Sequence, residues 1–166
     1  MKKLFFLLIT ICTTAITAKA GSFTNDSSSL SPLLNLYYQV KDALVTGNSE
    51  SAAVAAGEFV KAINGIDMKT LPAGDHAAFM SLHIKLAFDA RHISESKEIT
   101  HQREHFKSFS DNFYTLAKKV KLSREPVYQQ YCPMKKAYWL SNEEEIKNPY
   151  FGNQMLTCGK VTAKLK

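Results

Sequence analysis

The sequence predicts a mainly α-helical protein, an antiparallel four-helix bundle with a C-terminal cap that is irregular or forms a short β-hairpin. Two observations lead to this fold class. Up to about residue 122, apolar side chains recur at three- and four-residue spacing in four segments joined by short connections, as in helices that pack side by side. From residue 123 onward, short aromatic runs with β propensity alternate with turn residues.

The N-terminus has the layout of a secretory signal peptide. Two lysines precede an apolar run over residues 4–18, and Ala18-Lys19-Ala20 fits a small-x-small cleavage site. The run is short for a membrane span, so we expect residues 1–20 to be removed by cleavage near Ala20-Gly21. The mature protein is then periplasmic or secreted and has no transmembrane segment. Residues 21–29 are small and polar, which predicts a flexible leader.

Residues 30–166 are expected to form a single domain, in which residues 123–166 are the cap. Three of the 21 basic residues lie in the signal peptide and none of the 15 acidic ones does, so cleavage lowers the net charge from +6 to +3. This mild bias comes with no Arg/Lys stripe and no aromatic-basic repeat. The composition therefore argues against a nucleic-acid partner.

Helix boundaries follow from caps and breakers. The first helix is predicted to start with Ser31 as N-cap and to end at Gly47, and the alanine-rich second helix to span about residues 49–64. Asp75 and Ser96 are the predicted N-caps of the third and fourth helices. In the cap, the runs with β propensity are residues 127–131 and 137–140, followed by a turn-rich loop over residues 148–153.

The runs YCPM, AYWLS and EIKNPYFGNQMLTCG, together with the helix-four stretch EITHQREHFKSFSDNFYTLAKKV, resemble the domain-of-unknown-function family numbered 3347. The resemblance extends from the first predicted helix to Cys158. Members of that family occur as short exported bacterial proteins, and also fused to periplasmic adaptor subunits of copper/silver-type heavy-metal efflux pumps. The resemblance therefore implies soft-metal handling, with a heavy-metal efflux complex or its adaptor as the partner.

Four sulfur side chains in the cap are predicted metal ligands: Cys132, Met134, Met155 and Cys158. Thiolate and thioether sulfur are soft donors that suit Cu(I). A zinc site would more usually show cysteines two residues apart or Cys/His pairs. The methionines therefore favour copper, as Cu(I), over zinc.

A disulfide is the alternative for the same two cysteines. Cys12 leaves with the signal peptide, and an even pair in an oxidising compartment is by default a Cys132–Cys158 disulfide. It would close a loop of about 27 residues and add about 3–4 kcal/mol of stability in the loop-entropy model. Met134 and Met155 would then be core fillers. Both interpretations stay open, and a thiol redox protein is a weaker third.

Two histidines are candidates to complete a sulfur site. His105 and His101 are four residues apart on one helix face, on the flank of the apolar stripe, where solvated histidines are the alternative. His83 lies within the apolar stripe of the third helix, where a buried, hydrogen-bonded histidine is the alternative. Either could reach the sulfurs if the cap folds over helices three and four. His76 and His92 are expected to be exposed.

No nucleophile motif, His-Glu-x-x-His pattern or acid/base carboxylate pair is present, so we expect no enzymatic activity. The expected function is soft-metal binding, in periplasmic metal capture or in hand-over to an efflux system. The alternative is a non-catalytic interaction module stapled by the Cys132–Cys158 disulfide.

Overall fold

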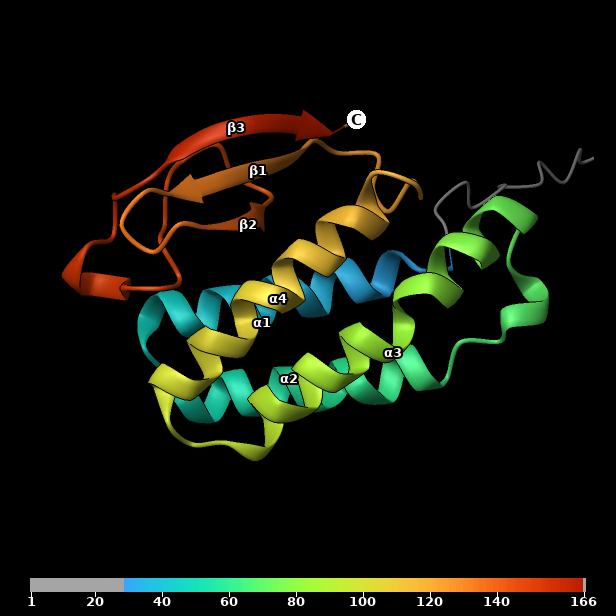
Figure 1. Ribbon diagram of the computed structural model, residues 1–166, viewed down its shortest axis with the longest axis horizontal. Helices are drawn as coiled ribbons and strands as arrows, with labels where there is room; N and C mark the ends of the chain where they lie inside the picture. The colour runs from blue at the N-terminus through green and yellow to red at the C-terminus, as the bar shows by residue number, and fades with distance from the viewer. Residues whose placement is uncertain (1–28, 166) are drawn as a thin grey trace, which may run out of the picture.

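The computed structural model describes residues 29–165, which form four helices followed by a small three-stranded antiparallel sheet (Figure 1). The predicted signal peptide and all but the last residue of the predicted leader lie outside the described residues. The elements are α1 (Ser31–Thr46), α2 (Ser49–Asn64), the 3-10 turn η1 (Met68–Thr70), α3 (Ala73–Glu95), α4 (Ile99–Ala117), β1 (Val127–Cys132), β2 (Ala137–Ser141), η2 (Gly152–Gln154) and β3 (Lys160–Leu165). None of the helices in this range is long and apolar enough to cross a membrane.

Two of the predicted helix boundaries are confirmed and three N-caps are corrected. Gly47 ends α1 in the left-handed conformation, with φ 73°, and α2 spans the predicted residues. The N-cap of α1 is Leu30, one residue before Ser31. The other two corrected N-caps are Pro72 for α3 and Glu98 for α4. Asp75 instead lies in the first turn of α3, where a carboxylate complements the positive end of the helix dipole.

The molecule is arranged in layers, with the sheet packed over α1 and α4 and with α2 and α3 on the side away from the sheet (Figure 1). Helices that are consecutive in the chain pack against each other. Buried aromatic rings from three helices meet where α1, α2 and α4 approach, namely Tyr37, Phe59, Phe106, Phe109 and Phe113. Tyr37 is stacked on Phe113 with ring centroids 4.8 Å apart.

The cap contains one strand more than the predicted hairpin. The strand order is β2-β1-β3, so β1 is central and pairs antiparallel with both neighbours. Polar and apolar residues alternate along β3, in the sequence KVTAKL, which is the period expected of a strand with one face on the protein. The strand was missed because it is largely exposed and, unlike β1 and β2, contains no aromatic residue.

The outer edge of β2 bonds two tyrosine hydroxyls, one from α1 and one from the loop before η2. Tyr37 Oη accepts a hydrogen bond from the backbone N–H of Leu140 (3.0 Å) and shares another with Ser110 Oγ (2.7 Å). Tyr150 Oη donates to the carbonyl oxygen of Tyr138. Burial raises the pKa of Tyr37 above its ordinary value, so its hydroxyl stays protonated. One side chain thus joins α1, α4 and the sheet.

Tyr37→Phe is expected to lower the free energy of unfolding by about 1–3 kcal/mol, because the N–H of Leu140 is left buried without an acceptor. Urea denaturation followed by circular dichroism measures this loss. Tyr138→Phe is the matched control, since Tyr138 is exposed and its hydroxyl makes no hydrogen bond to residues 29–165. Equal stability of the Tyr37→Phe and wild-type proteins would contradict the bridging role.

Gly152 permits the close contact between the loop before β3 and the end of α1. Its φ of 55° lies in the left-handed region, and a Cβ there would stand 2.8 Å from both the carbonyl oxygen of Val45 and the guanidinium of Arg103. Arg103 holds the same junction by donating to the carbonyl oxygens of Pro149 (2.8 Å) and Leu44 (2.9 Å). This junction fixes the loop that leads to Cys158.

Gly152→Ala is expected to destabilise the protein by about 2 kcal/mol or more, through backbone strain together with overpacking. Thermal unfolding of the variant tests this. Gly74→Ala is the matched control, because Gly74 lies in the first turn of α3 with nothing within 4 Å of its added Cβ. A melting temperature that falls equally in both variants would contradict the assignment.

Candidate metal centre

The two cysteines of the cap lie side by side. Cys132 is the last residue of β1, and Cys158 comes two residues before β3 begins. Since Tyr131 pairs with Lys160 in the β1–β3 register, the chain brings Cys158 next to the end of β1. The two Sγ atoms are 3.9 Å apart, and both cysteines are free thiols.

Two neighbouring residues, Asn148 and Gly159, hold Cys158 in place. Asn148 is fully buried, and its Nδ2 donates to the carbonyl oxygen of Cys158 (2.7 Å) while its Oδ1 accepts from the N–H of Tyr150 (2.9 Å). A Cβ on Gly159 would lie 2.8 Å from the indole of Trp139. The contacts of these two residues therefore fix the backbone on both sides of Cys158.

Backbone N–H groups of the β1–β2 turn face the sulfurs. The N–H of Lys135 donates to Cys132 Sγ (3.4 Å). Burial raises the pKa of the Cys158 thiol, and its neighbour Cys132 adds to this, while a backbone hydrogen bond from Met134 acts in the opposite direction. Cys158 is therefore a neutral thiol near neutral pH, and a bound metal would have to displace its proton.

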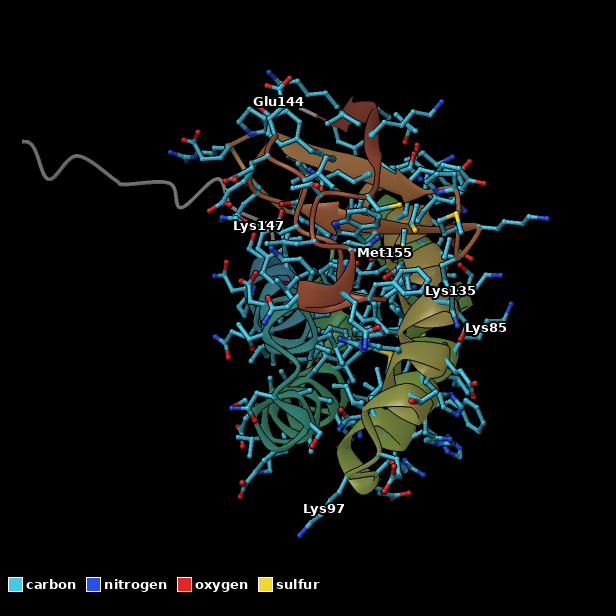
Figure 2. The ribbon with its side chains drawn as sticks, turned by 90° about the vertical axis from the view of Figure 1, so that its left-hand side faces the viewer. Lys85, Lys97, Lys135, Glu144, Lys147 and Met155 are labelled. Carbon is cyan, nitrogen blue, oxygen red and sulfur yellow. The ribbon has the colours of Figure 1, made fainter. Side chains whose placement is uncertain are left out.

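The two methionines differ in exposure. Met134 lies in the turn between β1 and β2 and is 64% exposed, so it is not the core filler that the disulfide alternative predicted. Met155 follows η2 and is partly buried (Figure 2). Cys132 is fully buried and Cys158 is half-buried. Exposure thus increases from Cys132 through Cys158 to Met134.

The histidines proposed as additional ligands lie on the helices. The Nδ1 of His105 is 3.3 Å from Asp89 Oδ1 of α3, and its ring stacks on His92, which is half-buried and not exposed as expected. His83 stacks on Phe79, with a buried Nδ1 that has no protein partner. Within residues 29–165, no group of three His, Cys, Asp or Glu ligands includes either cysteine. The cap packs over α1 and α4, whereas His105 faces α3.

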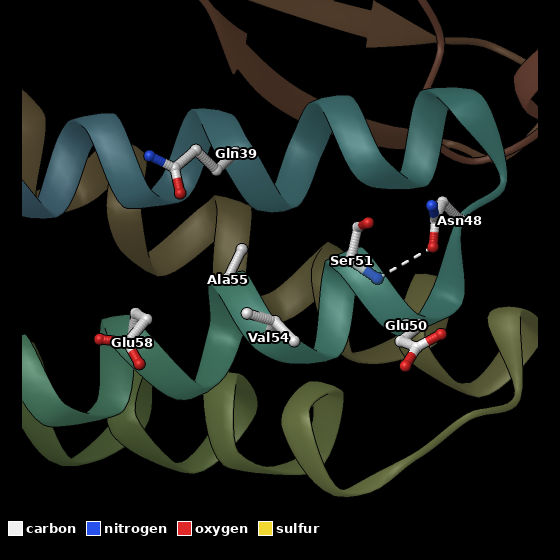
Figure 3. Close-up of a pocket in the computed structure, with 7 residues that line it drawn as sticks. All are labelled: Gln39, Asn48, Glu50, Ser51, Val54, Ala55 and Glu58. Atoms are coloured by element: carbon white, nitrogen blue, oxygen red, sulfur yellow. Dashed lines mark hydrogen bonds between the residues drawn. The ribbon is translucent and has the colours of Figure 1, made fainter.

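A pocket of about 470 Å³ opens between α1 and α2, and Figure 3 shows its lining. The residues around it are Gln39, Asn48, Glu50, Ser51, Val54, Ala55 and Glu58. One of them, Asn48, caps α2 by accepting from the N–H of Ser51 (2.9 Å). The pocket holds no sulfur or imidazole donor, so it is unrelated to the metal-ligand candidates.

Together these features define a small, mainly helical protein whose C-terminal sheet carries a fixed pair of thiols. The family model described as "Protein of unknown function (DUF3347)" matches residues 33–125, more than half of the chain, and the chain belongs to this family. The matched range covers the helices and ends before Cys132, so the sulfur segment lies beyond it. No curated protein and no solved structure matches the chain.

Iodoacetamide is expected to modify Cys158 before Cys132, because Cys158 is half-buried and Cys132 is fully buried. The rate at Cys158 near neutral pH should be lower than in the unfolded chain, since its raised pKa reduces the thiolate fraction, and it should increase as the pH rises. Peptide mass spectrometry with and without urea measures both rates. Earlier modification of Cys132 would contradict the arrangement of the pair.

Proposed function

We propose that this is an exported protein that binds a soft transition metal, with Cu(I) as the preferred ion, through Cys132 and Cys158. The observation that carries the proposal is the 3.9 Å separation of the two Sγ atoms. Two sulfurs at about 2.3 Å from one ion and 3.9 Å from each other subtend an angle of about 116° at that ion. This angle suits a three- or four-coordinate site without movement of the backbone.

The donor set favours a soft ion. No carboxylate or imidazole of the described residues joins the two thiols in a three-ligand group, and the methionines supply thioether sulfur nearby in the sequence. Thiolate and thioether donors select Cu(I) over harder cations. Met134, which is exposed, is the proposed third ligand, and Met155 is the proposed fourth. His105 and His83 are not part of this proposal, because their neighbours lie on the helices.

The increase in exposure from Cys132 through Cys158 to Met134 suits the capture and release of a metal ion. A metal held by the buried Cys132 and the half-buried Cys158 stays open to an incoming ligand on the side of Cys158. A partner thiolate or thioether could enter from that side as Met134 leaves. We propose that the protein acts in periplasmic metal capture or in hand-over to an efflux system. This role rests on the family resemblance and on the predicted signal peptide.

We further infer that the four helices act as an antiparallel bundle that serves as a rigid platform for the Cys/Met cap. The packing of consecutive helices and the tyrosine bridges to β2 support this inference.

The rival function is a non-catalytic interaction module held by a Cys132–Cys158 disulfide. The short distance between the two Sγ atoms also supports this rival function, since a disulfide needs them to move from 3.9 Å to about 2.05 Å apart.

The test is an anaerobic titration of the reduced protein with Cu(I) in competition with a chromogenic chelator. We expect one ion per chain. Cys132→Ser and Cys158→Ser should each weaken binding by more than about 100-fold, since losing a ligand costs more than losing an outer-sphere partner. Met134→Ala should weaken it by about tenfold, or about 1.4 kcal/mol. Met80→Ala is the matched control, because Met80 is an exposed methionine on α3.

The remaining outcomes of the Cu(I) titration would each indicate a different site or function. Binding that is lost only with the cysteines would mean a dithiol site with Met134 outside it. No competition at all by the reduced protein would contradict the proposal and favour the disulfide-held module.

A further inference from the structure

A cluster of three histidines lies where α3 is followed by α4, on the face that α4 turns to α3 and not on the face that the cap covers. His92 comes from the last turn of α3, and His101 and His105 come from the first two turns of α4. One ligand nitrogen of each lies within 4.8 Å of the others. In Figure 2, Lys97 marks the connection between these helices, remote from Met155 at the sheet.

The connection between α3 and α4 is held tightly. Gln102 is fully buried, and its amide nitrogen Nε2 donates to the carbonyl oxygens of Ser96 (2.7 Å), Ser49 (2.8 Å) and Ile93 (3.2 Å). These bonds tie the start of α4 to the end of α3 and to the start of α2. The backbone that carries the three imidazoles is therefore held by buried polar contacts and not by a loose loop.

Asp89 orients His105. The carboxylate is 5% exposed, and its Oδ1 lies 3.3 Å from His105 Nδ1 and accepts a hydrogen bond from Ser108 Oγ (2.7 Å). A proton on Nδ1 that points at Asp89 leaves Nε2 as the free ligand atom of His105. Carboxylates bound to the distal nitrogen of a histidine are the usual outer-sphere partners of metal-ligating imidazoles.

Phe88 forms an apolar wall beside the cluster although it is 55% exposed. Its ring centroid is 4.4 Å from that of His92 and 6.1 Å from that of His105. The contact of the Phe88 ring with both imidazoles limits the access of water to one side of the cluster. His101, which is exposed, leaves the other side open.

We propose that His92, His101 and His105 bind a borderline divalent cation of the Zn(II) and Cu(II) class, with Asp89 as a positioning residue. Imidazole suits these ions, and three histidines leave a fourth position open to solvent. Metal–nitrogen bonds of 2.0–2.1 Å place the nitrogens of a tetrahedral site about 3.3 Å apart. The nitrogens reach this spacing by rotation of the exposed His101 and of the half-buried His92, whose ring is stacked on that of His105.

The site is independent of the proposed sulfur site, because the two share no residue and differ in donor chemistry. Spectroscopy separates them, since a thiolate ligand gives Co(II) an intense sulfur-to-metal charge-transfer absorption and an imidazole does not. Co(II) is therefore the probe, and Zn(II) is the competitor.

Titration of the exported protein, purified in its processed form, is expected to give one Co(II) per chain with d–d bands only, displaced by Zn(II) and unchanged in Cys158→Ser. His92→Ala and His101→Ala should each weaken Co(II) binding by more than about 100-fold, and Asp89→Asn by about 10–100-fold. Asp89→Asn should also shift the d–d spectrum while the melting temperature is retained. His76→Ala is the matched control, because His76 is exposed on α3, the helix that carries His92.

Binding that survives both His92→Ala and His101→Ala would overturn the inference. So would Co(II) binding that disappears in Cys158→Ser, and in that case the sulfur site would stand alone. Binding that fails in the histidine variants but not in Cys158→Ser would support the histidine site whatever the Cu(I) titration shows.

Discussion

The outer edge of β2 imposes the constraint on which the cap depends. In an antiparallel sheet, every second residue of an outer strand directs its N–H and C=O away from the partner strand, and those groups need partners when they are buried. In β2 the outward-facing residues are Tyr138 and Leu140, and the hydroxyls of Tyr150 and Tyr37 bond the C=O of Tyr138 and the N–H of Leu140. Because Tyr37 belongs to α1 and also bonds Ser110 of α4, satisfying this edge fixes the sheet on two helices.

The position of the thiols follows from that anchorage. With β2 fixed, β1 ends at a set place above α1 and α4, and the register of β3 with β1 brings Cys158 to Cys132. Gly152 and Asn148 then hold the intervening loop against the end of α1 and against Cys158 itself. Two thiols 26 residues apart in sequence are thus preorganised, whether they bind an ion or form a bond with each other.

The chain also separates two kinds of donor. Sulfur lies at the sheet, and the histidine cluster lies between α3 and α4, where Asp89 bonds His105. Soft and borderline cations prefer these donors differently, so a protein with both sites in use would sort metals by chemistry and not by size. The separation has a structural cause, since the cap covers α1 and α4 while the histidines line the face that α4 shares with α3.

The sequence by itself determined the four helices, two of the three strands and the four sulfur candidates, because 3.6-residue periodicity, aromatic runs with β propensity and residue chemistry are local signals. The tertiary structure decided the rest. β3 was missed because it is largely exposed and has no aromatic residue, and its pairing with β1 is what brings Cys158 to Cys132. His92 was expected to be exposed because the sequence does not show its neighbours from α4, and only the packing of α3 on α4 brings it against His105.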